Sequence, residues 1–182
     1  MRITNNEIHF DRSDIPLIKR RGLQAVIDEA IEFSERNEHP YIQDMYQLRR
    51  VLSVRISDIN EVRTHLGDYY REFTISKNSG KSRKIYAPQG LLAFIQHRIK
   101  REILEYYTIS QYATAYHKGA RLSDNAAPHC GKKYLLKLDL KDFFGHITYE
   151  KVYKNVFNSK HFPQFIGLTL TDFCCYKGYI PQ

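Results

Sequence analysis

Two aspartates lie within one of the most apolar stretches of the chain, KYLLKLDLKDFFGHI, which spans residues 133–147. Aspartate is a poor strand former and is costly to bury without a partner, so Asp139 and Asp142 need an explanation. One explanation is a surface carboxylate paired with Lys137 and Lys141. The other is a metal ligand in a cleft, at the end of a strand. The stretch by itself leaves both interpretations open.

A second group of residues able to do chemistry is basic. It lies in and after a glycine-containing loop and comprises Lys77, Lys81, Arg83 and Lys84. Lysine and arginine can follow phosphates without reading bases, so this group could hold a polyphosphate or a nucleic-acid backbone. The alternative is an ordinary solvated hairpin tip.

Hydrophobic periodicity predicts the element that carries the aspartates. Alternate residues of 136–140 are leucine, and the positions between and after them are Lys137, Asp139 and Lys141. This period of two predicts a sheet strand with one packed face and one wet face. Asp139 then lies on the polar face, and Asp142 lies where the strand ends.

The basic loop is predicted to join two strands, since the runs on either side of it read DYYREFTI and SRKIYAP. Residues 14–66 before this hairpin have helical periodicity. After Pro88 the sequence GLLAFIQHRIKREILEYY predicts a basic amphipathic helix, and TYEKVYKNVF predicts another helix further on. A basic helix of this kind is often only a solvated surface helix.

Composition bounds the class of protein. The 182 residues suffice for one domain with a core, or one domain and part of another. Lys plus Arg is 28 against 20 Asp plus Glu, a formal charge of +8, and aromatic residues make up 13%. Basic charge mixed with aromatics suits a nucleic-acid binder, although a merely basic soluble domain fits as well.

The sequence carries no sign of secretion or of a membrane segment. The three cysteines include the adjacent pair Cys174 and Cys175, and they give no disulfide framework. His117 and His129 do not complete a zinc-site spacing. The amino terminus lacks the apolar core of a signal peptide, and no run of about 18 apolar residues exists. We therefore expect a cytoplasmic protein with no membrane partner.

Five segments in order form a recognisable pattern: SGKSRKIYAP, LLAFIQHRIKREIL, AYHKGARLSDNAAPH, YLLKLDLKDFFGHI and CCYKGYIPQ. Together they resemble the amino-terminal half of a bacterial reverse transcriptase, most closely the retron type and more distantly the group II intron type. The resemblance covers roughly residues 68–182. LDLKDFF looks like the first catalytic block, residues 125–129 are similar to a retron Asn-Ala-x-x-His element, and the closing IPQ looks like the start of a Pro-Gln-Gly block.

The resemblance implies an α+β fold that is a fragment of a right-hand polymerase. Residues 1–66 would be a helical N-terminal extension, residues 67–130 the fingers, and residues 131–182 a partial palm, an incomplete sheet with packed helices. The Tyr-x-Asp-Asp block of the family does not occur in the sequence. Asp172 does not replace it, because it lies in a helical apolar segment and is expected to be a surface residue. We therefore expect a portion of a longer enzyme that is inactive alone.

The resemblance also implies a catalytic metal site. Asp139 would be the catalytic aspartate and a ligand of both Mg²⁺ ions of a two-metal centre. The carbonyl of Leu140 would complete the metal shell, and the amides near Asp142 and Phe143 would face the nucleotide triphosphate. Asp142 itself would be a structural carboxylate at the side of a turn.

Further positions match residues of the family that bind the nucleotide. Phe144 matches the bulky gate that rejects a ribose 2′-hydroxyl, although a core aromatic is the simpler interpretation. Arg83, with Lys77 or Lys81, matches the cations of the fingers that grip the incoming dNTP. Gln182 matches the glutamine that lies against the nucleotide sugar.

Four residues are predicted to contact RNA. They lie on the basic helix and in the retron-like element: Arg98, Arg101, Asn125 and His129.

The activity implied is that of an RNA-directed DNA polymerase. Retron enzymes copy part of a structured noncoding RNA into DNA, prime from a 2′-hydroxyl of that RNA, and serve antiphage defence with an effector protein. The alternative is a noncatalytic RNA-binding or scaffold module related to reverse transcriptases.

Overall fold

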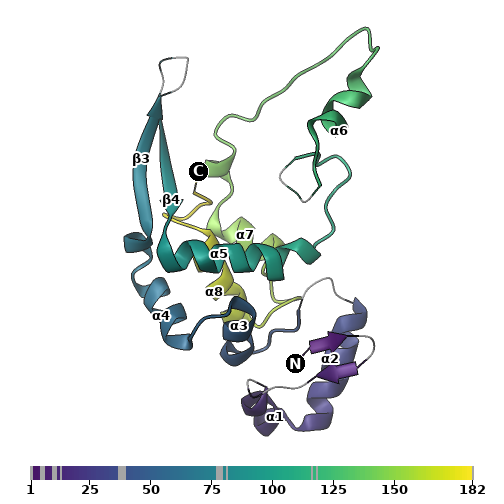
Figure 1. The fold of residues 1–182 in the computed structure, drawn as a ribbon, viewed down its shortest axis with the longest axis vertical. Coiled ribbons are helices and arrows are strands. Elements are labelled where there is room, and N and C mark those ends of the chain that lie inside the picture. The colour runs from purple at the N-terminus through teal and green to yellow at the C-terminus, as the bar shows by residue number, and fades with distance from the viewer. Residues whose placement is uncertain are drawn as a thin grey trace. The chain divides into compact units, whose positions relative to one another are not determined.

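The computed structural model describes residues 2–4, 7–9, 12, 14–36, 40–76, 80, 82–115, 117 and 119–181. The chain forms two compact units, and Figure 1 shows its elements. The larger unit comprises residues 1–106 and 142–182, and the smaller comprises residues 107–141. The α-helices are α1 (Ile15–Arg21), α2 (Leu23–Arg36), α3 (Met45–Leu52), α4 (Ile56–Thr64), α5 (Gly90–Glu102), α6 (Leu122–Ala126), α7 (Tyr149–Asn155) and α8 (Gln164–Cys174). The strands are β1 (Arg2–Thr4), β2 (Glu7–His9), β3 (Tyr70–Ser76) and β4 (Ser82–Pro88).

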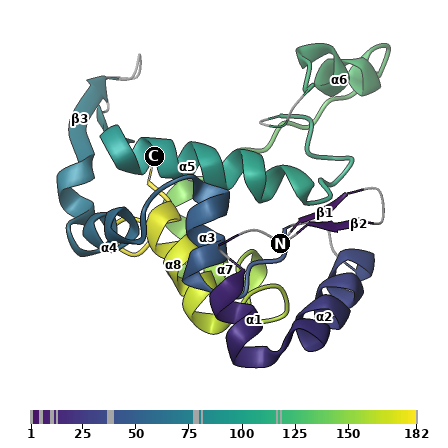
Figure 2. The same cartoon turned by 60° about the horizontal axis from the view of Figure 1, so that its bottom comes forward.

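Helix α5 is the centre of the larger unit. It packs against α3, α4 and α8, and both views show it crossing α8 (Figures 1 and 2). Leu92, Ile95 and Ile99 recur at helical spacing and are buried in this contact. An apolar stripe of this kind must be covered by other elements, so α5 sets where the neighbouring helices lie.

Polar groups at the ends of α3 fix its length. The carboxylate of Asp44 accepts hydrogen bonds from the backbone amides of Tyr46 and Gln47, both at 2.9 Å. These amides have no partner within the helix, so the aspartate caps its start. Ser53 ends the helix in a left-handed conformation, with φ of 58°.

A buried amide joins the first helices to this core. The side chain of Gln47 donates a hydrogen bond to the carboxylate of Asp14 at 3.0 Å, and both residues are fully buried. The Gln47 side-chain oxygen accepts in turn from the backbone amide of Gln43 at 2.7 Å. Because a buried polar group without a partner is costly, Gln47 ties the start of α1 to α3.

Helices α7 and α8 pack closely at a glycine. A Cβ atom added to Gly167 would lie 2.0 Å from the carbonyl oxygen of Phe157, the residue that follows the end of α7 by two positions. Phe157 and Phe162 are buried beside this contact, with ring centroids 6.1 Å apart. The approach of the two helices therefore requires a residue without a side chain.

Asp172 links three helices, and 27% of its side chain remains exposed, in agreement with the prediction of a surface residue on its helix. Its side chain, on α8, forms an ion pair with Arg63 of α4 at 2.8 Å. It also accepts a hydrogen bond from the hydroxyl of Tyr149 at the start of α7, at 2.8 Å. Burial of the ring, and then this hydrogen bond, raise the pKa of Tyr149. The helical periodicity of this segment gave no sign of these partners, which come from α4 and α7.

The structure confirms most elements that the sequence predicts. Helices fill much of residues 14–66, the two strands of the hairpin pair with Tyr70 opposite Pro88, and helices form after Pro88 and at TYEKVYKN. The structure contains both helices and antiparallel strands, which confirms the predicted α+β class. The short pair β1–β2 at the amino terminus was not anticipated. The division into extension, fingers and palm remains a prediction.

The strand expected at residues 136–140 is wrong. These residues have no regular secondary structure and pair with no described segment. Their leucines are exposed rather than packed: 80% for Leu136, 82% for Leu138 and 71% for Leu140. A strand forms only where a neighbouring strand pairs with its backbone amides and carbonyls. Alternation of apolar and polar residues predicts the two faces of a strand, but it does not provide that neighbouring strand.

Among the described residues, no helix combines the length and the apolar character needed to cross a membrane.

We expect Gly167→Ala to destabilise the chain. Glycine to alanine inside a helix ordinarily raises stability by up to about 1 kcal/mol, but here the new methyl group would overlap a backbone carbonyl. Overpacking of this kind costs about 1–3 kcal/mol, which should appear as a lower midpoint of chemical denaturation. Phe165→Ala, at an exposed position of the same helix, is the control. A Gly167→Ala variant as stable as the original chain would contradict the close packing.

Candidate functional site

The segment DFFGHI forms a tight turn that is closed by its own side chains. Asp142 begins the turn with φ of 52°, in the left-handed region that aspartate tolerates. Nδ1 of His146 lies 2.7 Å from the carbonyl oxygen of Asp142, within hydrogen-bond distance. A Cβ atom on Gly145 would lie 2.6 Å from the Asp142 carboxylate, so that carboxylate folds back over the glycine. This geometry suits the structural role predicted for Asp142.

The residues after this turn pair with the last described residues of the chain. The backbone amide of Ile180 donates to the carbonyl of Ile147 at 3.0 Å, and the amide of Tyr149 donates to the carbonyl of Gly178 at 2.8 Å. Thr148 and Tyr179 form an antiparallel bridge between these bonds. The segment that follows the DFF motif and the segment that leads into IPQ therefore lie side by side.

A two-residue turn presents the second of these segments. Tyr176 and Tyr179 exchange backbone hydrogen bonds of 2.9 and 3.3 Å. Between them, Lys177 and Gly178 both have positive φ, 53° and 89°. Positive φ at both central positions defines the type I′ turn, for which glycine at the second position is favoured.

Tyr176 connects this turn to the base of the β3–β4 hairpin. Its ring stacks on Tyr70 of β3, with centroids 4.3 Å apart and planes at 24°. The same ring meets the edge of Tyr86 on β4, at 5.3 Å and 65°. We call Tyr70, Tyr86 and Tyr176 the tyrosine cluster. It holds the hairpin against the segment that leads into IPQ.

The tyrosine cluster is also joined to the helical core. The side-chain amide of Gln96, on α5, donates to the hydroxyl of Tyr70 at 3.1 Å and to the backbone carbonyl of Phe173, on α8, at 2.8 Å. Burial of the ring raises the pKa of Tyr70 to about 12.

Charges surround the tyrosine cluster. The Lys177 ammonium lies 4.7 Å from the ring centroid of Tyr86 and 5.2 Å from that of Tyr176, within the range of cation–π attraction. It also lies 3.6 Å from the carboxylate of Glu72, which forms a second ion pair with Lys84 at 2.6 Å. The hydrogen bond from Lys84 lowers the pKa of Glu72, so the carboxylate stays ionised.

The two faces of the hairpin differ, and Arg83 lies on the face away from the tyrosine cluster. Arg83 pairs across the ribbon with Ile75, whereas Lys84 pairs with Thr74 and shares its face with Glu72. Side chains alternate along a strand, so successive residues of β4 point to opposite faces. Arg83 is exposed there.

The aromatic pair of the DFF motif is only partly covered. Phe143 and Phe144 meet edge to face, with ring centroids 5.8 Å apart. Phe143 is 50% exposed and Phe144 is half-buried. Neither belongs to the fully buried core.

Asp139, the predicted catalytic aspartate, lies in the smaller unit, whereas Arg83, Asp142 and Phe144 lie in the larger unit. Asp139 and Leu140 are exposed residues of the irregular segment before the turn. The described residues contain no group of three or more histidine, cysteine, aspartate or glutamate side chains that could hold a metal ion.

Curated proteins with similar sequences are retron reverse transcriptases. The retron Ec86 reverse transcriptase of Escherichia coli is 30% identical over 146 residues, which cover 79% of this chain and 45% of that protein. The retron Mx65 reverse transcriptase of Myxococcus xanthus is 36% identical over 84 residues, 46% of this chain and 20% of that protein. The retron Ec83 reverse transcriptase of E. coli is 36% identical over 92 residues, 50% of this chain and 30% of that protein.

The chain is therefore similar in sequence to part of several retron reverse transcriptases. It spans less than half the length of these curated relatives. The match to the retron Ec86 reverse transcriptase covers 146 residues, which is more than residues 68–182 contain. The similarity therefore extends further toward the amino terminus than the motifs indicated. No family model matches the chain.

Two of the residues predicted to bind RNA, Arg98 and Arg101, lie on α5. Arg98 points inward: its guanidinium donates to the carbonyl of Val51 at 2.7 and 3.2 Å and forms an ion pair with Glu102 at 2.8 Å. Arg101 keeps 51% of its side chain exposed and lies 2.7 Å from the same glutamate. Arg98 therefore has a packing role, and RNA binding by either arginine stays a prediction.

The other two predicted RNA contacts lie in the smaller unit. Asn125 is an exposed residue of α6, and His129 is an exposed residue of the 3₁₀ turn that follows. Three predicted nucleotide-binding residues, Lys77, Lys81 and Gln182, lie outside the described residues.

The motif search missed two residues that position the retron-like segments. Tyr176 and Lys177 form the contact between the IPQ-leading segment and the hairpin. The sequence did contain a signal, because a Lys-Gly pair between two tyrosines is compatible with a tight hairpin turn.

We expect Tyr176→Ala to loosen the hairpin. The loss of two aromatic contacts should lower the free energy of unfolding by about 1–3 kcal/mol. Amide hydrogen exchange in β3 and β4 should become about tenfold faster or more, because the base of the hairpin loses its cover. Tyr112→Ala, which removes an 85% exposed ring, is the matched control. Unchanged exchange in the hairpin would refute the anchoring role of Tyr176.

Proposed function

We propose that this chain contributes the fingers and the first part of the palm of an RNA-directed DNA polymerase of the retron type. The observation that carries the proposal is the match to a retron reverse transcriptase over 79% of the chain. The order of the motifs supports it, since the hairpin, the basic helix, the LDLKDFF block and the IPQ segment follow one another as the resemblance requires.

The arrangement within the larger unit is compatible with nucleotide binding. The backbone pairing of residues 147–149 with residues 178–180 holds the DFF turn near the segment that leads into IPQ. The tyrosine cluster joins that segment to the basic hairpin. A site for dNTP would use amides of the turn and the end of this segment. Arg83 lies on the hairpin face away from the tyrosine cluster, so its part in this site rests on the resemblance alone.

Each of these parts has a proposed role. Arg83, with Lys77 or Lys81, grips the triphosphate of the incoming dNTP, because a guanidinium binds phosphate oxygens through paired hydrogen bonds. Phe144 blocks a ribose 2′-hydroxyl. Gln182 lies against the sugar.

The proposed metal chemistry rests on the resemblance alone. Asp139 would supply one carboxylate ligand and Leu140 one carbonyl ligand to a pair of Mg²⁺ ions. The described residues provide no complete site, so the remaining carboxylates must come from other residues of the enzyme. We therefore propose that these 182 residues do not synthesise DNA alone.

The proposed template is a structured noncoding RNA, which the enzyme copies into DNA from a primer 2′-hydroxyl. The formal charge of +8 favours an RNA partner, because each neutralised phosphate releases counterions. From the resemblance to retron enzymes, we also propose that the protein acts in antiphage defence together with an effector protein. On the same basis we propose that it is cytoplasmic.

One observation favours a second candidate, a noncatalytic RNA-binding or scaffold module. Asp139 lies in an exposed, irregular segment, where it makes no metal cluster with other described residues. In such a module Asp139 would be an ordinary surface carboxylate.

The two candidates differ in the effect of Asp139→Asn in the complete enzyme. We expect the variant to lose DNA synthesis by a thousandfold or more, on the order of an essential metal ligand, while its RNA affinity stays within about twofold. Primer extension and RNA binding are measured on the same preparation. Asp68→Asn, the same charge change at an exposed position of the larger unit, is the control. Extension by the Asp139 variant at near the original rate would refute the role of Asp139. Absence of extension by the original complete protein, with RNA binding intact, would favour the noncatalytic module.

A comparison with the neighbouring Lys84 tests whether Arg83 binds the nucleotide specifically or contributes only positive charge. Arg83→Ala should raise the KM for dNTP by about tenfold or more, as expected when a charge-assisted hydrogen bond is lost. Lys84→Ala removes the same charge from the opposite face of the ribbon and should change this KM much less. Steady-state primer extension measures both. An equal rise for the two variants would mean that the hairpin acts only as a basic surface.

A further inference from the structure

His146 serves two carbonyl groups of the DFFGHI turn. Its ring atom Nδ1 lies 2.7 Å from the carbonyl oxygen of Asp142, and its backbone amide donates to the carbonyl of Phe143 at 3.1 Å. The next carbonyl, that of Phe144, accepts from the amide of Ile147 at 3.0 Å. Three successive carbonyls of the turn therefore have a donor, and the side chain of His146 serves the first of them.

The identity of the acceptor fixes the proton on the ring. A carbonyl oxygen only accepts hydrogen bonds, so Nδ1 of His146 carries the hydrogen. Nε2 of the neutral ring then has a lone pair and no hydrogen. A histidine side chain in water favours the opposite arrangement, with the hydrogen on Nε2. The tautomer of His146 is therefore set by the carbonyl of Asp142, and it reports on this contact.

Asp142 begins the turn in a strained conformation. Its φ of 52° lies in the left-handed region, which crowds the Cβ atom of any residue except glycine against the backbone. Residues persist in such conformations only where the surrounding contacts hold them. The hydrogen bond from His146 holds the carbonyl of Asp142, and the lack of a side chain at Gly145 leaves room for its carboxylate. The ring of His146 thus supports the residue that directs the chain into the DFF motif.

Helix α7 holds the backbone of His146 from the other side. Nζ of Lys151, in the first turn of α7, donates to the carbonyl of His146 at 2.9 Å. The next residue, Ile147, accepts a hydrogen bond from the amide of Ile180 in the segment that leads into IPQ. His146 therefore joins the left-handed start of the turn to a helix and to the second motif segment.

The turn presents two aromatic rings and two free amides. Phe143 is exposed and Phe144 is half-buried. The amides of Asp142 and Phe143 donate to no backbone carbonyl of the described residues. The directions of these amides and of the Phe144 ring depend on the same few backbone dihedral angles. A small rotation at Asp142 would move all of them, and small displacements of groups that position a substrate are costly for catalysis.

We propose that His146 is a positioning residue, whose ring holds the DFF turn in the conformation that selects a deoxynucleotide. The inference rests on the proposed function, from which it takes the nucleotide contacts of Phe143 and Phe144. His146 itself touches no substrate and acts through the carbonyl of Asp142. Because Asp142 is exposed, water can replace the lost donor, so a variant of His146 should fold while its turn is less well defined.

The first measurement is the tautomer of His146 in the complete enzyme. Nitrogen-15 NMR of protein labelled at histidine distinguishes a ring nitrogen that carries hydrogen from one that does not. The signal of this ring is assigned by its loss in the His146→Asn variant. We expect the neutral ring to carry its hydrogen on Nδ1. A hydrogen on Nε2 would mean that the ring does not bind the carbonyl, and the proposal would be wrong.

Two variants of similar shape separate the hydrogen bond from the size of the side chain. Asparagine can place an amide N–H where histidine has its Nδ1–H, whereas leucine has the same branching and no donor. His146→Asn should stay within about twofold of the original enzyme in kcat/KM for dNTP and in its preference for dNTP over rNTP. His146→Leu should lower both quantities about fivefold, the change expected for one lost hydrogen bond.

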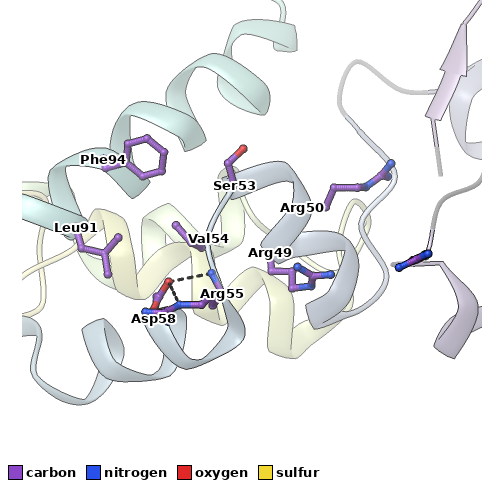
Figure 3. Close-up of a pocket in the computed structure, with 9 residues that line it drawn as sticks. Arg49, Arg50, Ser53, Val54, Arg55, Asp58, Leu91 and Phe94 are labelled. Carbon is purple, nitrogen blue, oxygen red and sulfur yellow. Dashed lines mark hydrogen bonds and ion pairs between the residues drawn. The ribbon is translucent and has the colours of Figure 1, made fainter.

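A similar contact outside the turn provides the control for a general loss of stability. Asp58 lines a pocket at the corner between α3 and α4 and accepts a hydrogen bond from the backbone amide of Arg55 at 3.0 Å (Figure 3). Asp58→Ala removes this local contact at the start of α4 and should leave the preference for dNTP unchanged. Thermal denaturation midpoints are measured for every variant, so that a change in preference is compared at equal stability.

The outcomes separate this inference from the proposed function. If the leucine and asparagine variants behave alike, or if Asp58→Ala lowers the preference as much as His146→Leu, the positioning role fails and the proposed function stands. If the original complete enzyme extends no primer, the proposed function fails, and the inference about nucleotide selection fails with it.

Discussion

The constraint on which the candidate site depends is a backbone pairing between two segments far apart in sequence. Residues 147–149 and 178–180 exchange hydrogen bonds, and each segment is continuous with a motif that the sequence singled out. The pairing lets α7 and α8 pack as one layer between the two motifs, with Gly167 permitting their close approach. Tyr176 extends the same arrangement to the hairpin. Removal of this pairing would leave the motifs connected only by the helices between them.

Local pattern predicted most of the fold. The helices and the β3–β4 hairpin follow from periodicity and from a glycine-containing loop, because the forces that form them act within about ten residues. The same local reasoning placed Asp142 in a turn and Arg83 on an exposed strand. Both positions depend on backbone geometry that the nearby residues determine.

The misses share one physical cause, which is a partner distant in sequence. Residues 136–140 have the alternation of a strand but no neighbour among the described residues, so the backbone forms no ladder. Asp172 is partly exposed, as its spacing indicates, but its ion pair with Arg63, which precedes it by 109 positions, was not anticipated. Arg98 has the spacing of a solvated face, yet the carbonyl that ends α3 draws it inward. The spacing of residues predicts which face of a helix or strand they occupy. It does not predict which residues of other elements contact that face.

The exposed leucines of residues 134–140 also have a consequence for the protein in a concentrated solution. An irregular, apolar segment that pairs with no described strand is a template for β-strand addition, either by another part of the enzyme or by a second copy. Lys137 and Lys141 interrupt the apolar run and act as gatekeepers, because stacking identical copies would bring like charges together. The lysines that flank Asp139 thus oppose fibre formation in a segment whose leucines favour it.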